Sequence, residues 1–202
     1  MIDQMEMMRV LEKLRGDAVV VAVFRAHVAW TQVTNNPRRD VPIGTLEFPA
    51  AMGVASPFAL GFCLARPDTK VIVLDGDGSL LLNLGSLVTI ANQGPKNLYH
   101  FVMNNGVYAT TGGQKVPGAG RSSFTGMAQA AGYAHAYEFD DLEEFTNRAA
   151  EVLSREGPVL VSVKAVPSIR SPGQRGRDIP TTSLKHRPQA IDFLLEQFGG
   201  TE

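Results

Sequence analysis

Four short, almost wholly apolar runs constrain the fold of this chain more than any other feature. They read AVVVAVF (residues 18–24), KVIVLD (70–75), LYHFVM (98–103) and PVLVSVK (158–164). Continuous runs of this kind indicate strands that are buried on both faces. Segments of helical length lie before and between them, over residues 5–14, 52–64, 80–92, 124–131 and 142–155. The alternation predicts an α/β fold, in which a doubly wound, mainly parallel sheet carries helices on both faces.

The length and composition fit one globular domain. A chain of 202 residues with 44% hydrophobic content can bury one continuous core. We predict that residues 1–165 form this domain, and that residues 166–202 add a C-terminal arm and a short helix to it. The arm is rich in Pro, Gly, Ser and Arg and has no periodicity, which is typical of a long surface segment. The amphipathic stretch 190–198 predicts the short helix.

The overall charge and the cysteine content exclude several classes of protein. The 19 basic and 20 acidic residues leave a net charge of −1, so no global field attracts nucleic acid or an acidic membrane. The single cysteine, Cys63, excludes an internal disulfide and a thiolate cluster. No stretch approaches the roughly 20 apolar residues of a membrane span. We therefore expect a cytoplasmic protein that binds neither nucleic acid nor a membrane.

Two polar clusters follow neighbouring strand-like runs. Residues 76–79 (GDGS) come directly after the second run, and residues 104–105 (NN) come directly after the third. Ligands of open parallel sheets bind beyond the carboxyl ends of the strands, so both clusters should lie on one rim. The two glycines let the backbone approach a ligand closely, and Ser79 precedes a helix whose first N–H groups suit a phosphate.

The side chains of these clusters favour a metal-bridged diphosphate. Asp77 offers a carboxylate oxygen and the two asparagines offer amide oxygens, which are ligands that Mg²⁺ prefers. Either cluster by itself is more typical of a tight turn. The interpretation depends on their conjunction, with one helix and one strand between them.

Several segments resemble the thiamine diphosphate (ThDP) enzymes. GDGS followed by NN is similar to the signature of the domain that anchors the cofactor's diphosphate. AAMGVASPFALGFCLA (residues 50–65) resembles the helix entry of the same domain, and GPKNLYHFVMNNGVYATTGGQ (residues 94–114) resembles the small subunits of sulfopyruvate and phosphonopyruvate decarboxylases. The resemblance covers residues 18–164 and implies the ThDP-binding fold for the predicted domain.

The resemblance implies ThDP and Mg²⁺ as cofactors and gives roles to individual residues. Mg²⁺ would be held by Asp77, Asn105 and the backbone carbonyl of Val107. The cofactor itself would contact Gly76, Gly78 and Ser79 at the diphosphate, Met52 beneath the thiazolium ring, and Ala50 together with the Met52 N–H at the aminopyrimidine edge. Thr110 and Thr111 would face the substrate, although simple turn chemistry explains them equally well.

The resemblance also implies a partner chain. In this family a glutamate of a second, pyrimidine-binding domain activates the cofactor, and this chain has the length for one such domain only. Glu47 would lie in the wrong domain, so we interpret it as a structural or interface residue. We expect a subunit that is inactive alone and that forms a hetero-oligomer with an alpha subunit, with at least two copies of each chain.

Three functions stay open from the sequence. The first is the beta subunit of a 2-oxoacid decarboxylase of the sulfopyruvate or phosphonopyruvate type. The second is an acetolactate synthase-like carboligase, because His27 and Trp30 resemble an H-x-x-W motif whose histidine approaches the diphosphate. The third is a non-catalytic nucleotide-binding or scaffold protein, in which GDG and NN are only turns.

The basic C-terminal arm leaves a further alternative open. It could fold over the cleft and bind an anionic substrate, since arginine suits bidentate contact with oxyanions. A solvated or partner-docking tail is the commoner role of such a segment. The residues concerned are Arg170, Arg175, Arg177, Lys185 and Arg187.

Overall fold

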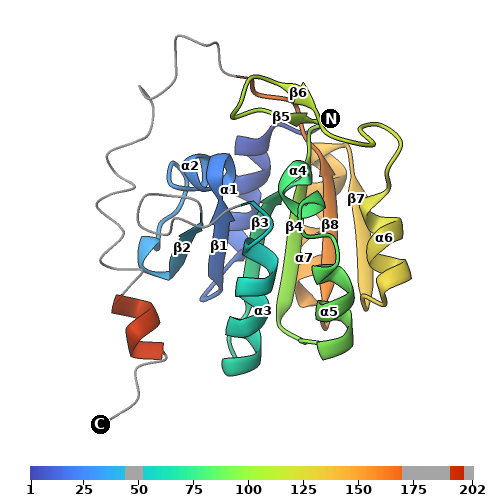
Figure 1. The fold of residues 1–202 in the computed structure, drawn as a ribbon. Coiled ribbons are helices and arrows are strands. Elements are labelled where there is room, and N and C mark those ends of the chain that lie inside the picture. Colours follow the sequence, from blue (N-terminus) through green and yellow to red (C-terminus); the bar gives the residue numbers. More distant parts are fainter. Residues whose placement is uncertain (44–51, 170–191, 198–202) are drawn as a thin grey trace.

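The computed structural model describes residues 1–43, 52–169 and 192–197, and its centre is a six-stranded sheet (Figure 1). The strand order is β2-β1-β3-β4-β8-β7, and every pair of neighbours is parallel. The chain passes from β1 to the edge strand β2 and then returns to β3 on the other side of β1. This reversal makes the gap between β1 and β3 the topological switch point, where α/β sheets bind ligands. The strands are β1 (Val19–Val23), β2 (Asp40–Ile43), β3 (Val71–Gly76), β4 (Leu98–Asn104), β7 (His135–Phe139) and β8 (Val159–Lys164).

Helices cover both faces of the sheet, as the sequence predicted. One face packs against α1 (Gln4–Leu14), α2 (Phe24–Trp30) and α7 (Leu142–Ser154). The other packs against α3 (Ala55–Ala65), α4 (Asp77–Leu81), α5 (Ser86–Gln93) and α6 (Phe124–Ala131). Alternate residues of each strand enter the two cores; in β1, Val20 and Ala22 face one layer while Val19, Val21 and Val23 face the other. Within the described residues, no helix has both the length and the apolar composition that a bilayer crossing needs.

The four predicted strands and most predicted helices are confirmed to within a few residues, and the structure shows three differences. The helix predicted over 52–64 begins only at Ala55. The helix predicted over 80–92 is two helices, α4 and α5, because a turn at residues 82–85 interrupts it, and α4 already begins at Asp77, so Ser79 lies inside the helix that it was predicted to precede. The third difference is a set of short elements that the sequence did not predict: α2, the 3₁₀ turn η1 (Pro37–Arg39), the edge strands β2 and β7, and the hairpin of β5 (Val107–Tyr108) and β6 (Gln114–Lys115).

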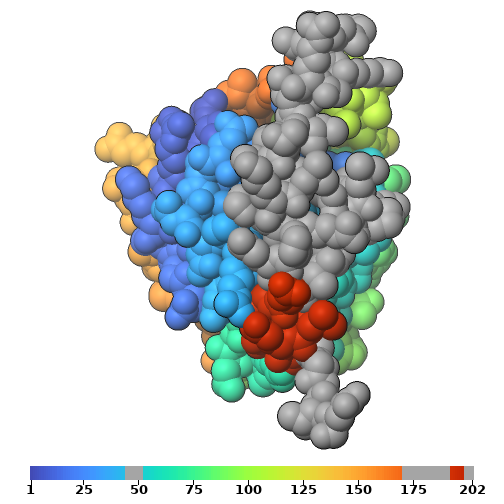
Figure 2. All heavy atoms as spheres, turned by 90° about the vertical axis from the view of Figure 1, so that its left-hand side faces the viewer, coloured from blue at the N-terminus to red at the C-terminus, as the bar shows by residue number. Residues whose placement is uncertain are grey.

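The short helix predicted at the C-terminus is confirmed over residues 192–197, and it packs against the body of the domain. Phe193 is buried and stacks on Phe62 of α3, with ring centroids 6.3 Å apart. The Arg39 guanidinium lies 5.4 Å from the centre of the same Phe193 ring. Arg38 also pairs with Glu196. Figure 2 views the molecule from the β2 side and shows this helix in red beside the light-blue segment that ends in β2.

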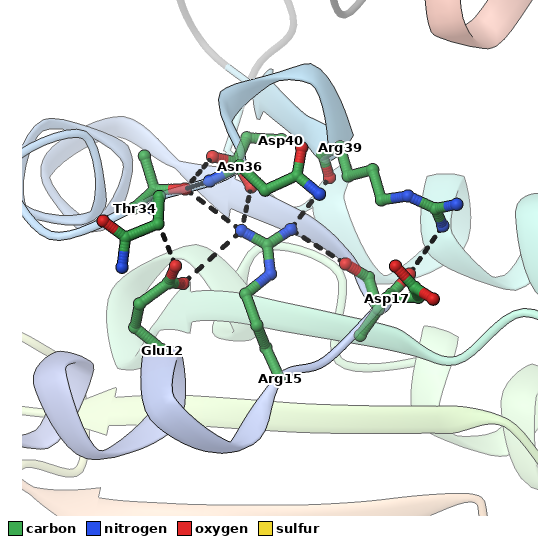
Figure 3. A network of polar contacts seen from close by, with 9 residues as sticks. Glu12, Arg15, Asp17, Thr34, Asn36, Arg39 and Asp40 are labelled. Atoms are coloured by element: carbon green, nitrogen blue, oxygen red, sulfur yellow. Dashed lines mark hydrogen bonds and ion pairs between the residues drawn. The ribbon is translucent and has the colours of Figure 1, made fainter.

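A buried polar network joins α1 to the start of the edge strand β2 (Figure 3). Arg15, at the end of α1, donates to Asp40 Oδ1 at 2.8 Å and to the Ala18 carbonyl at 2.8 Å. Thr34 donates its hydroxyl to Asp40 Oδ2 at 2.6 Å. The Arg15 guanidinium also lies 5.3 Å from the centre of the Trp30 ring. The network therefore holds α1, α2 and β2 together at the end of the sheet away from the GDGS turn.

Cys63 provides a chemical probe of this core. Its side chain is 1% exposed, and burial raises the pKa of the thiol to about 12. Since the thiolate is the reactive species, we expect Cys63 to react with a thiol reagent such as DTNB at pH 8 at least about 100-fold more slowly in the native chain than in guanidinium chloride. Absorbance at 412 nm would follow the reaction. Fast labelling of the native chain would contradict this packing of α3.

Candidate functional site

The two predicted polar clusters meet at the carboxyl ends of β3 and β4. Asp77 begins α4 directly after β3, and its side chain is only 2% exposed. Its Oδ1 accepts a hydrogen bond from the Gly78 N–H at 2.7 Å, and its Oδ2 accepts one from the Gly106 N–H at 2.6 Å. Asn105 Oδ1 accepts from the Val107 N–H at 2.9 Å. The Asp77 carboxylate therefore ties the GDGS turn to the NNG loop, on the rim where the sequence placed both.

Two side chains, Ser79 and Asn83, clamp the backbone of Gly53 and so hold the segment that carries Met52. The Gly53 N–H donates to Ser79 Oγ at 3.0 Å, and Asn83 Nδ2 donates to the Gly53 carbonyl at 2.9 Å. Asn83 lies in the turn that separates α4 from α5. The interruption of the predicted helix therefore places the Asn83 side chain where it can bind Gly53. Gly53 has φ +81, and a Cβ there would lie 2.9 Å from Asn83 Cβ. Only glycine fits this position without displacing the clamp.

Gly78 is the second position where a side chain cannot be accommodated. An added Cβ would lie 2.4 Å from Tyr108 Cε1. The Tyr108 ring, at the start of the β5–β6 hairpin, packs directly on the backbone of the turn. Close contact between Gly78 and Tyr108 therefore fixes β5 against α4, and Figure 1 shows the hairpin above α4 at this end of the sheet.

These elements enclose a cavity of about 350 Å³ at the carboxyl end of the sheet. Nine of the residues singled out from the sequence line it: Met52, Gly76, Asp77, Gly78, Ser79, Asn105, Val107, Thr110 and Thr111. The sequence reasoning missed other lining residues, among them Gln4, Phe24, Arg25 and Tyr108. Arg25 could have been found, because it follows the first strand and so lies on the same rim. Gln4 had no such signal, because only the packing of α1 brings it there.

Other predicted residues lie elsewhere. His27 is 4% exposed on the buried side of α2 and is not among the described residues that line the cavity. Trp30 is a core residue that packs on Arg15. Ala50, Glu47 and the basic residues of the arm fall outside the described part of the chain, so their predicted roles stay predictions.

The electrostatics of the cavity centre on Asp77. Burial raises the pKa of its carboxyl group, and the neighbouring Asp75 adds to this effect, against the N–H groups of Gly106 and Gly78. Of the described residues that line the cavity, only Asp77 and Arg25 carry a charge. Among all the residues that the structure describes, no group of three or more His, Cys, Asp or Glu side chains could hold a metal ion. A cation here would therefore need amide, carbonyl, phosphate or water oxygens beside Asp77, which is a donor set that suits Mg²⁺.

Comparison with known proteins gives one family and several relatives. Residues 27–163 match the family described as "Thiamine pyrophosphate enzyme, C-terminal TPP binding domain". The phosphonopyruvate decarboxylase of Streptomyces hygroscopicus is 38% identical over 117 residues, which are 58% of this chain and 29% of that protein. The sulfopyruvate decarboxylase subunit beta of Methanothermobacter thermautotrophicus is 34% identical over 170 residues, which are 84% of this chain and 81% of that subunit.

A solved structure supports the fold. It is described as a candidate thiamin diphosphate-dependent enzyme from Mycobacterium smegmatis and superposes with a TM-score of 0.69 at 20% identity. The match covers 83% of this chain and 32% of the other. The chain thus spans less than a third of two of these proteins but most of the beta subunit.

Proposed function

Because the chain belongs to the thiamine pyrophosphate enzymes and carries their C-terminal TPP-binding domain, we propose that it is the diphosphate-binding subunit of a 2-oxoacid decarboxylase that uses ThDP and Mg²⁺. The observation that carries this proposal is the contact of Asp77 with Gly106, which joins the GDGS turn and the NNG loop on one wall of the cavity. The similarity to proteins named phosphonopyruvate decarboxylase and sulfopyruvate decarboxylase subunit beta supports the reaction. Membership of this family also speaks against a non-catalytic scaffold.

Each residue of the cavity has a task in this proposal. Asp77, Asn105 and the Val107 carbonyl would hold Mg²⁺. In the first turn of α4 the Gly78 N–H is engaged by Asp77 Oδ1, and the N–H groups of Ser79 and Leu80 would face the diphosphate. Ser79 accepts from Gly53, and its own O–H can still donate to a phosphoryl oxygen. ThDP, when bound, supplies the electron sink that decarboxylation of a 2-oxoacid requires.

The remaining wall of the cavity would position the cofactor ring and the substrate. Met52 is held beside Ser79 by the Gly53 clamp, so its side chain would support the ring from a fixed position. Thr110 and Thr111 are exposed at the rim, where a substrate would enter. Such fixed groups contribute by holding the reacting parts in productive geometry.

The proposal includes a partner chain that supplies the activating glutamate. The chain spans 29% of a phosphonopyruvate decarboxylase but 81% of a subunit named beta, which supports a split enzyme. We expect the purified chain alone to show no decarboxylation of a 2-oxoacid, and activity to require an added alpha subunit. A CO₂-release assay with pyruvate, phosphonopyruvate and sulfopyruvate measures this. Turnover at normal enzyme rates by the chain alone would contradict the split site.

Product analysis separates decarboxylation from carboligation. With pyruvate, a decarboxylase releases acetaldehyde, whereas the carboligase alternative forms acetolactate. The motif that suggested a carboligase gives it little local support, because His27 is not among the lining residues and Trp30 lies in the core. Acetolactate as the main product would nevertheless decide for that alternative.

Arg25 would select an anionic substrate. It follows β1, so it lies across the switch point from Asp77, and its guanidinium donates to Ser168 Oγ at 3.1 Å. A phosphonate or sulfonate group in the cavity would give Arg25 a charge-assisted contact, worth about 1.5–3 kcal/mol. In the reconstituted enzyme we expect Arg25→Gln to raise KM for such substrates roughly 10- to 100-fold, and KM for pyruvate much less.

Steady-state kinetics with the two substrate types would check this prediction. Arg38→Gln is the matched control, because Arg38 is exposed and pairs with Glu196 outside the cavity. A weaker affinity for ThDP with unchanged substrate preference would instead assign Arg25 to the cofactor's diphosphate. Equal effects of Arg25→Gln on all substrates would also contradict the selective role.

A further inference from the structure

A fully buried histidine–aspartate pair lies beneath the rim loops. Asp75 on β3 and His100 on β4 are both 0% exposed, and His100 Nε2 lies 3.3 Å from Asp75 Oδ2. In the tautomer that carries its proton on Nε2, the imidazole donates this hydrogen bond to the carboxylate oxygen. Both side chains point to the same face of the sheet, because Val73 is in register with His100 and Asp75 is two residues further along β3.

The pair is connected to the predicted metal ligand by a continuous series of contacts. Asp75 Oδ1 accepts a hydrogen bond from the Gly76 N–H at 2.8 Å. Gly76 is the N-cap of α4, and the next residue, Asp77, accepts from Gly106 in the NNG loop. His100 therefore supports Asp75 on one side, while Asp75 holds the backbone of the GDGS turn on the other.

Folding stability gives a weak reason for this arrangement. The surroundings on this face are apolar, with Val73, Val102 and Leu160 in the same core cluster. Removing a carboxylate and an imidazole from water costs free energy that their contact does not reliably offset, and apolar side chains of similar volume often serve as well. His100 Nδ1 also has no hydrogen-bond partner among the described residues, which adds to the cost. A role in fixing orientation accounts for the pair better.

We propose that His100 is a positioning residue for the GDGS turn. Its hydrogen bond holds the Asp75 carboxylate in the orientation that accepts the Gly76 N–H, and this sets the direction in which Asp77 leaves β3. The inference rests on the proposed function of the rim. In that function, the orientation of Asp77 matters because Asp77 would bind Mg²⁺ beside a diphosphate. Groups that hydrogen-bond directly to metal ligands typically change metal affinity 10- to 100-fold when they are replaced, and His100 acts one contact further away, through Asp75.

Amide hydrogen exchange tests the positional role without any ligand. His100→Leu removes the donor but keeps an apolar volume, and we expect exchange of the Gly76, Gly78 and Gly106 amides to become at least about tenfold faster. His100→Gln retains an amide donor near the position of Nε2 and should restore most of the protection. Exchange in β7, at the far edge of the sheet, should be unchanged in both variants.

Calorimetry of Mg²⁺ with ThDP gives the second readout. We expect His100→Leu to weaken binding about 10- to 100-fold and His100→Gln to stay within about threefold of the wild-type chain. Ser162→Ala is the matched control, because Ser162 is equally buried on the neighbouring strand β8 but is not part of the series of contacts. It should leave both exchange and binding unchanged.

The outcomes separate this inference from the proposed function. Unchanged exchange at the rim in a folded His100→Leu chain would overturn the positional role, even if its melting temperature fell. If the wild-type chain binds ThDP neither alone nor together with the alpha subunit, the proposed function fails, while the exchange data still decide whether His100 orders the turn. If His100→Leu does not fold, His100→Asn replaces it with the same expectations, because its shorter amide stays polar but does not reach Asp75 Oδ2.

Discussion

Replacing Asp77 by asparagine should remove most of the stabilisation that Mg²⁺ and ThDP give to the wild-type chain. At about 100 times Kd, a ligand of the native state adds about 2.7 kcal/mol to the free energy of unfolding. For a chain of this size that corresponds to a rise in melting temperature of roughly 5–10 °C, and EDTA should remove it. Asp77→Asn keeps the shape of the side chain but loses the anionic oxygen, so affinity should fall about 100-fold or more.

Differential scanning calorimetry with and without Mg²⁺ and ThDP measures both chains. Asp68→Ala is a suitable control, because Asp68 is exposed in the turn before β3, at the opposite end of the strand from Asp77. The control should keep the full rise in melting temperature. An equal rise in Asp77→Asn would show that Asp77 does not hold the cation, and a rise with ATP or NAD instead of ThDP would favour a different nucleotide-binding function.

Replacing Arg15 by leucine should lower the free energy of unfolding by about 3–5 kcal/mol at pH 7. The guanidinium is almost fully buried beside Asp40, and its removal leaves a buried carboxylate without its cation. Urea unfolding measures the loss. Arg9→Leu, on the same helix, is the matched control, because the Arg9–Glu6 pair is exposed and surface changes usually stay within about 0.5 kcal/mol.

The pH dependence of the stability lost in Arg15→Leu tests whether the unpaired Asp40 carboxylate causes the loss. Burial already raises the pKa of Asp40 in the native chain, with Arg15 acting against the rise. An acid whose pKa is raised on folding contributes stability below its unfolded pKa of 3.8 and loses it as pH rises through the folded pKa. Without Arg15 the folded pKa rises further, so the difference between variant and wild type should be smaller at pH 4 than at pH 7.

A second variant separates the lost ion pair from lost packing. The double change Arg15→Leu and Asp40→Leu removes both charges of this pair and leaves Glu12 as the other carboxylate that Arg15 contacts, so we expect it to recover part of the lost stability. A loss that is the same at both pH values, and that the double change does not relieve, would mean that packing around Trp30 causes the effect.

A strand could be predicted from the sequence where its own residues form a clear apolar pattern. The four central strands are long apolar runs, and the structure confirms them within about a residue at each end. The edge strand β2 reads DVPI, with an acidic residue and a proline, and its pairing depends on β1 and the Arg15 network. The edge strand β7 is partly exposed, so its sequence HAYEF lacks a buried pattern. An edge strand forms because of its contacts with the neighbouring strand, and a pattern within the strand's own residues does not show those contacts.

The candidate site also has parts that the sequence predicted and parts that only the structure shows. GDGS and NN were predicted to share a rim because they end adjacent parallel strands, and the Asp77–Gly106 contact joins them. The sequence did not reveal that α4 stops at the turn carrying Asn83, which clamps Gly53 and thereby places Met52. It also did not reveal the place of His100, which looks like one polar residue in an apolar strand until the register sets it beside Asp75.

By itself, the sequence determined the layered α/β fold and the two loop tips of the site, because hydrophobic runs and glycine-rich turns act over a few neighbouring residues. The tertiary structure alone decided which strands are neighbours, which side chains close the cavity, and which buried polar groups support Asp77. Those contacts join residues that are far apart in the chain, such as Gly53 with Ser79 and Arg15 with Asp40. They are set by strand order and helix packing, and the free energy of such contacts exists only once the whole domain has assembled.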